Sequence, residues 1–96
     1  MAELACVAIT WARAGHEEQV RQALETLVPL GRAEEGALQY DMHRDVNEPR
    51  CFVFVERWTS DAAFDAHVKS SHVAAYLAQT GDWVERSEIR VMRKVE

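Results

Sequence analysis

The sequence contains few of the residues that build nucleotide-binding loops or disulfide frameworks. Its four glycines are too scattered for a glycine-rich phosphate loop, so we expect no dinucleotide or flavin site and no other built-in cofactor. The two cysteines, Cys6 and Cys51, lie far apart without a C-x-x-C motif, and we expect two buried free thiols. No apolar run approaches the roughly 20 residues that a membrane span needs. These absences disfavour a membrane protein, a disulfide-stabilised protein and a nucleotide-dependent enzyme.

Basic residues are also in the minority. Lys and Arg number 11 against 16 Asp and Glu, and the net charge of −5 disfavours a nucleic-acid partner held through its phosphates. The segment Met1-Ala2-Glu3 is neither basic nor followed by a signal-peptide core, so we expect the chain to stay in the cytoplasm. The length fits one domain, which we take as residues 1–96.

Hydrophobic periodicity in the first third of the chain predicts a strand and then a helix. Residues 4–12 are apolar on both alternating sets, which is typical of a strand buried on both faces. From His16 onward, apolar residues recur every three or four positions, as in an amphipathic helix. We expect this helix to end or kink near Val28, because Pro29 lacks an N–H and clashes with the preceding turn. A further turn should follow through Arg32 to Glu35 and close at Gly36.

The rest of the chain also contains both strand patterns and helix patterns. A turn-rich loop separates the second and third strands, so we expect them to form an antiparallel hairpin. The last strand changes phase near Ser87, which indicates a bulge. The predicted elements are strands at 37–44, 51–58 and 83–95 and helices at 59–69 and 72–79.

The order β-α-β-β-α-β predicts an α+β, ferredoxin-like sandwich. We expect the first and third strands to lie side by side and parallel, with the helices on one face of the sheet. The other face then has no cover within the chain, although both central strands carry apolar residues there. Leaving several hundred Å² of this surface exposed would cost on the order of 10 kcal/mol. We therefore predict that two sheets pack face to face in a homodimer.

His67 is the candidate general base. It follows Ala63 and Phe64 on the expected inner side of its helix, and a histidine can accept a proton near neutral pH. A purely structural histidine, bonded to the backbone or to a carboxylate, is the alternative. His72 lies five residues later, about 140° around a helix, so the two histidines would not share a face. We therefore expect no metal site, although His72 could reach the mouth of a pocket.

Aromatic residues supply the expected pocket walls. Trp58 and Tyr76 each carry a polar donor that needs a partner when buried, and we expect both to position the substrate. Tyr40 and Phe64 are further candidates for substrate contacts, although plain core packing is the simpler interpretation of Phe64. Flat walls with one or two donors suit a planar phenolic or quinonoid ligand.

Glu56 interrupts the most apolar strand of the chain, where an unpaired carboxylate would be costly to bury. We favour an ion pair with a neighbour of Arg57 or with an arginine of a partner chain, such as Arg90. The alternative is an acid with a raised pKa inside the site.

Three segments carry a family resemblance: EEGALQYDMHRD (34–45), FVFVERW (52–58) and AAFDAHVKSSHVAAY (62–76). They resemble the antibiotic biosynthesis monooxygenase (ABM) family, small dimeric α+β barrel proteins that include cofactor-independent quinol monooxygenases. The resemblance covers about residues 3–93, and E-x-W at 56–58 and A-H-x-x-x-x-H at 66–72 are its most specific parts. It implies a homodimer that uses O₂ on a small aromatic or quinol substrate, without a cofactor.

The same family includes proteins with other activities, and three alternatives follow. The chain could act as an oxygen-independent, isomerase-like enzyme, or as a dimer that binds small molecules without turnover. Haem degradation is disfavoured, because relatives with that activity differ from this chain at three places. They carry an asparagine on the first strand, a tryptophan in place of His67 and a histidine near Tyr76 or Leu77.

Overall fold

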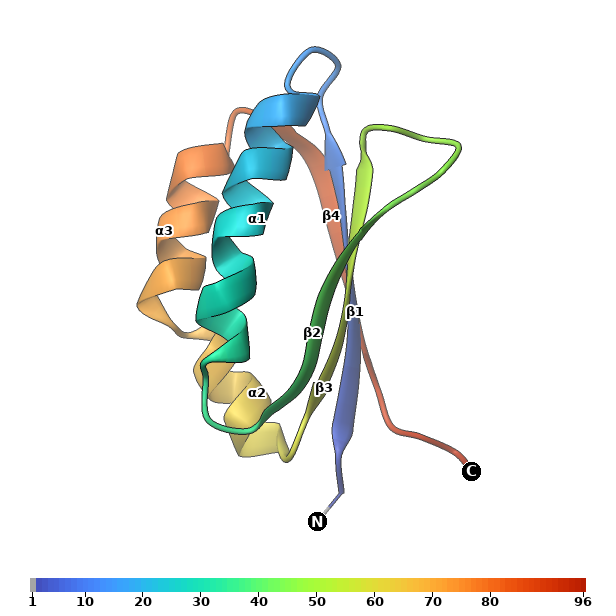
Figure 1. Cartoon of the computed structure of the whole chain (residues 1–96), viewed down its shortest axis with the longest axis vertical. Helices are drawn as coiled ribbons and strands as arrows, with labels where there is room; N and C mark the ends of the chain where they lie inside the picture. The colour runs from blue at the N-terminus through green and yellow to red at the C-terminus, as the bar shows by residue number, and fades with distance from the viewer. Residues whose placement is uncertain (1) are drawn as a thin grey trace.

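A four-stranded sheet is covered on one face by three helices in the computed structural model, which describes residues 2–96 (Figure 1). This arrangement confirms the predicted α+β, ferredoxin-like fold. No helix within the described residues combines the length and the apolar character needed to cross a membrane. The elements are β1 (Leu4–Ala12), α1 (Glu17–Arg32), β2 (Ala37–Arg44), β3 (Cys51–Trp58), α2 (Asp61–Val68), α3 (Ser71–Thr80) and β4 (Val84–Met92).

The sheet order is β2-β3-β1-β4, and every neighbouring pair is antiparallel. The prediction that β1 and β3 run parallel is therefore wrong. The helical crossover through α1 makes β1 parallel to β2, and the tight loop after β2 reverses the chain into β3. Because β3 lies between β1 and β2, it must run opposite to both.

The first helix does not end near Val28, whereas Gly36 closes the turn after it as expected. α1 runs through Pro29 to Arg32, and Gly36, with a φ of +87°, then turns the chain into β2. Pro29 removes the amide that would otherwise bond to the carbonyl of Glu25, but both residues are exposed, so water can satisfy that carbonyl. The proline is therefore tolerated inside the helix.

The expected bulge on the last strand is displaced. The register between β1 and β4 shifts between Trp11 and Ala12, opposite Arg86 and Val84, rather than at Ser87. The strand also ends at Met92, before the predicted limit of 95.

The core lies between α1 and the sheet. Leu24 and Leu27 of α1 pack with Phe54 and Tyr40 of the sheet, and Gly31 leaves room for the ring of Tyr40 against the helix backbone. A Cβ at position 31 would approach three atoms of that ring to under 3.0 Å. The ring of Tyr40 is therefore held in a fixed position between α1 and the sheet.

The opposite face of the sheet carries no helix (Figure 1). Val7 and Val55 face each other across β1 and β3 on this side, with Ile9 and Val53 one step further along, and all four are only half-buried. This face is where the sequence predicts a second subunit.

Candidate functional site

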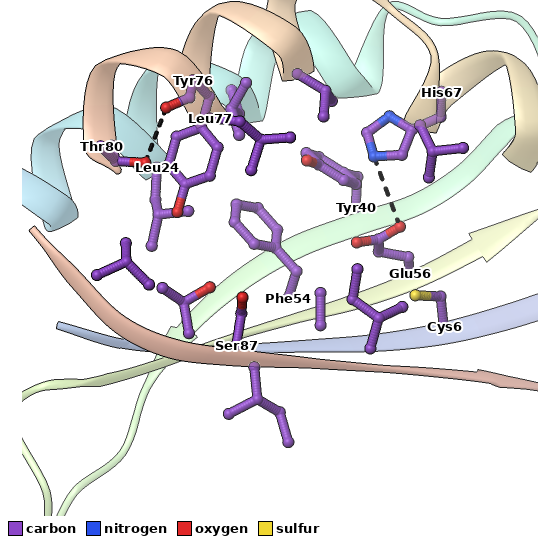
Figure 2. A pocket seen from close by; sticks show the side chains of 18 of the residues that line it. Cys6, Leu24, Tyr40, Phe54, Glu56, His67, Tyr76, Leu77, Thr80 and Ser87 are labelled. Atoms are coloured by element: carbon purple, nitrogen blue, oxygen red, sulfur yellow. Dashed lines mark hydrogen bonds and ion pairs between the residues drawn. The ribbon is translucent and has the colours of Figure 1, made fainter. Parts of the chain in front are cut away.

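A cavity of about 480 Å³ lies between the sheet and the helices. Figure 2 shows its floor of strand side chains, including Cys6, Phe54 and Glu56, beneath the side chains of α2 and α3. Two lining residues, Leu77 of α3 and Ile89 of β4, are 61% and 59% exposed, so the cavity opens to solvent between these elements. It is a largely apolar chamber with polar groups at one end.

His67 is held at that polar end, near the close of α2. Its Nδ1 lies 2.8 Å from Oε2 of Glu34, and its side chain is almost fully buried. Its ring stacks on Trp58 with centroids 4.6 Å apart, and the edge of Tyr40 closes another side at 5.2 Å. In the tautomer that donates the Nδ1 proton to the Glu34 carboxylate, Nε2 is the free acceptor of the ring.

Glu56 faces Nε2 from the floor. Its Oε1 lies 3.9 Å from His67 Nε2 (Figure 2). The same oxygen accepts a hydrogen bond from Trp58 Nε1 at 3.0 Å. Burial raises the pKa of the Glu56 carboxyl, while the Trp58 hydrogen bond and the charge of His67 partly oppose that rise. The charge of Glu34 raises the pKa further. Glu56 is therefore a buried acid whose ionised form is disfavoured.

Among residues 2–96, Glu56 forms no ion pair with an arginine, and its pairing with an arginine of a partner chain stays a prediction. Arg57 bonds instead to Glu3 and Gln39 on the surface, and Arg90 bonds to Glu88. Arg90 lies opposite Val7 on the open face of the sheet, whereas Glu56 lies opposite Cys6 on the helix-covered face. The structure supports the alternative, an acid with a raised pKa inside the site.

The two histidines meet, against expectation. His72 Nε2 lies 2.6 Å from the same Oε2 of Glu34 that contacts His67. The reasoning from one continuous helix fails because α2 ends at Val68 and α3 begins at Ser71, with Ser70 capping the new helix through Val73 N–H. The change of direction brings His72 back toward His67. The donor atoms of Glu34, His67 and His72 all lie within 4.8 Å of one another, a set that could hold a metal ion.

The predicted substrate-contacting residues divide into two groups. Tyr40, Tyr76 and Phe64 line the cavity, as does His67. Trp58 is fully buried behind Glu56, and its only polar donor is already used, so it does not reach the cavity wall. His72 contacts Glu34 and also lies away from that wall.

Three further ionisable groups on the cavity wall stay neutral near neutral pH. Burial raises the pKa of the Cys6 thiol to about 12, and the charge of Glu56 adds to the effect. Burial likewise raises the pKa of the Tyr40 and Tyr76 hydroxyls. Cys6 is therefore a poor nucleophile here, and the tyrosines are hydrogen-bond donors rather than bases.

Glu34 is the main site residue that the sequence did not predict. It lies in the turn between α1 and β2, where no periodicity marks a buried position. Arg86, Thr10 and Leu77 also line the cavity without having been predicted. Two of these three carried a usable signal: Thr10 continues the helix-facing set of Cys6 and Ala8 on β1, and Leu77 belongs to the apolar stripe of its helix.

Residues 4–79 match the family described as Antibiotic biosynthesis monooxygenase. The chain is 36% identical over 62 residues to "Putative monooxygenase YcnE" of Bacillus subtilis, with 65% of each chain covered, so it spans about two thirds of that relative's length. It is 30% identical over 83 residues to "Putative monooxygenase Rv0793" of Mycobacterium tuberculosis, which covers 86% of this chain and 81% of the relative.

Solved structures agree with these sequence matches. The crystal structure of PA3566 from Pseudomonas aeruginosa superposes with a TM-score of 0.95 at 29% identity, over 100% of this chain and 97% of that one. The structure of Rv0793 superposes with a TM-score of 0.92 at 27% identity, over 99% and 97%. The similarity extends over the whole described chain, including the elements that form the cavity.

Proposed function

Because the chain belongs to the antibiotic biosynthesis monooxygenase family, we propose that it is a cofactor-independent monooxygenase that acts on a small aromatic or quinol substrate. The observation that carries the proposal is His67: Glu34 fixes its Nδ1, and its Nε2 lies at the cavity beside Glu56. A histidine oriented by a carboxylate in this way is a typical general base.

The proposed reaction starts with a proton transfer. His67 Nε2 accepts the proton of a substrate hydroxyl, and the electron-rich anion passes one electron to O₂. The two radicals combine at a ring carbon that carries hydrogen, and the resulting peroxide anion takes the proton back from His67 to give a hydroperoxide. Loss of that C–H proton and cleavage of the O–O bond release water and leave a carbonyl, so one oxygen atom enters the product and the other leaves as water.

The other cavity residues support this chemistry by binding rather than by proton removal. The hydroxyls of Tyr40 and Tyr76, whose pKa values burial raises, can donate hydrogen bonds to the developing anion. Phe64 supplies a flat wall. We propose Trp58 as a positioning residue, since it holds Glu56 and stacks on His67.

Oxygen consumption tests the proposal directly. We expect the protein to accelerate O₂ uptake with freshly reduced naphthoquinols or with naphthols above the buffer rate. With a naphthol substrate, ¹⁸O₂ should place one labelled atom in the naphthoquinone product. A rate equal to buffer across such a panel would remove the oxygenase proposal. Turnover that persists without O₂ would indicate the isomerase-like alternative instead.

We also propose that the open sheet face pairs with a second copy of the chain. Its four half-buried apolar residues, Val7, Ile9, Val53 and Val55, form a self-complementary surface of the kind that a two-fold dimer uses.

Val55→Glu tests this pairing. It would bury two charges at a two-fold interface, one from each subunit, so we expect the dimer dissociation constant to rise at least about 100-fold. Sedimentation velocity at micromolar concentration measures the change, and Val46→Glu, in a loop where the side chain is 94% exposed, is the control. A wild-type protein that sediments as a monomer at this concentration contradicts the proposal.

A further inference from the structure

Three potential metal ligands converge on the side of His67 that faces away from Glu56. Glu34 Oε2 lies 2.8 Å from His67 Nδ1 and 2.6 Å from His72 Nε2. The three residues come from separate segments: the turn after α1, the last turn of α2 and the first turn of α3. We propose that Glu34, His67 and His72 form a binding site for a divalent transition-metal ion, for which Zn²⁺ is the probe.

The donor set matches the chemistry of such ions. Two imidazole nitrogens and one carboxylate oxygen are common ligands of Zn²⁺, with a fourth position left for water. Tetrahedral bonds of about 2.0–2.1 Å would place the donors about 3.4 Å apart, compared with separations here of 2.6 and 2.8 Å to Glu34 and at most 4.8 Å overall. Side-chain rotations that move the donor atoms by about an ångström convert the hydrogen-bonded cluster into a coordination sphere.

The local charge favours a bound cation. Glu34 and Glu56 flank His67 on its two ring nitrogens. Among residues 2–96, the ion pairs of Glu34 are those with the two histidines, and neither carboxylate is paired with a lysine or an arginine. A dication would neutralise the charge of Glu34 without requiring both imidazoles to be protonated.

The surroundings also suit a metal site. A carboxylate near the second ring nitrogen commonly orients a metal-bound histidine. Glu56 Oε1 lies on that side of His67, 3.9 Å from Nε2. A surface depression lined by Glu34, Ser60 and Ser70 gives access from solvent. The side chains of His67, Glu34 and His72 are 7%, 15% and 20% exposed, so the site is shielded but reachable.

The ion would lie outside the main cavity, whose wall includes neither Glu34 nor His72. An ion on Nδ1 of His67 leaves the ring proton on Nε2, the atom assigned above as the base. This consequence rests on the proposed function: Zn²⁺ should then inhibit turnover, and a chelator should restore it.

Metal binding is measured without any substrate, so its outcome is independent of the oxygenase test. The full chain, stripped with chelator, is titrated with Zn²⁺ against a chromophoric competitor, and with Co²⁺ to record the visible spectrum of the bound ion. We expect one ion per chain. His72→Ala and Glu34→Gln should each weaken Zn²⁺ binding about 100-fold and abolish the Co²⁺ bands.

Two variants outside the cluster serve as matched controls. His43 and Glu35 are exposed, and His43→Ala and Glu35→Gln should bind Zn²⁺ as the wild type does. Circular dichroism confirms that each variant is folded. The proposal is overturned if the wild type shows no Co²⁺ bands, or if His43→Ala weakens Zn²⁺ binding as much as His72→Ala.

Discussion

Replacing His67 with alanine should lower the rate of O₂-dependent turnover by about 10²–10⁴-fold, the range expected when a general base is removed. The substrate would still meet Tyr40, Tyr76 and Phe64 on the cavity wall, so kcat should fall while KM changes little. Steady-state O₂ uptake with a chelator present measures both constants.

Added imidazole distinguishes a base from a structural residue. The variant leaves a space the size of the lost ring beside Trp58 and Tyr40, next to the cavity. Imidazole that enters this space can accept the proton, so the rate should recover with imidazole concentration. His43→Ala, on an exposed strand position, should show neither the loss nor the recovery. Full wild-type turnover by His67→Ala would remove the assigned role and leave the oxygenase proposal standing.

Local patterns are enough to predict most of the fold. Short, strongly apolar segments predict β1 and β3, and the helix expected at 59–69 is α2, where the Ser60 hydroxyl accepts a hydrogen bond from Ala63 N–H. The predicted parallel direction of β1 and β3 was wrong because strand direction depends on how the α1 crossover combines with the β2–β3 hairpin. This is a property of the topology, which periodicity does not reveal. The effect of Pro29 on α1 was not predictable for a similar reason. The free-energy cost of a proline inside a helix depends on whether water reaches the carbonyl that loses its hydrogen bond.

The site was only partly predictable, and the residues show why. Glu56 and Trp58 are two positions apart on one strand, so they share a face, and the indole N–H was a readable partner for the carboxylate. The contact of His72 with Glu34 was not readable, because it depends on the angle between α2 and α3 and on a turn residue 38 positions away. Contacts along one element follow from sequence spacing, whereas those between elements need the tertiary structure.

The second large effect concerns stability. Glu56→Gln should raise the melting temperature at pH 8 by at least about 4 °C. The glutamine oxygen can still accept the hydrogen bond of Trp58 Nε1, but the buried charge is gone. A buried charged group with few partners costs on the order of 1–3 kcal/mol, and each kcal/mol shifts the melting temperature by about 4–8 °C in a domain of this size.

The pH dependence gives the sign of the effect. Burial raises the pKa of Glu56 in the folded protein, so between the unfolded and folded pKa values the folded state holds more protons than the unfolded state. The protonated Glu56 therefore contributes to the free energy of unfolding of the wild type. This contribution is fully present below the unfolded pKa, near 4.3, and is lost as pH rises through the raised folded pKa. Glu56→Gln lacks this pH-dependent contribution, so the two melting temperatures should converge in acid and separate as pH increases.

Thermal unfolding from pH 4 to pH 8, followed by circular dichroism, measures this separation. Glu48→Gln, in the exposed loop between β2 and β3, removes one carboxylate without removing a buried charge, and its curve should run parallel to that of the wild type. If Glu56→Gln is less stable than the wild type at pH 8, the ionised carboxylate is instead held by favourable contacts. Glu56 would then be a fixed negative charge that faces His67 Nε2 from 3.9 Å.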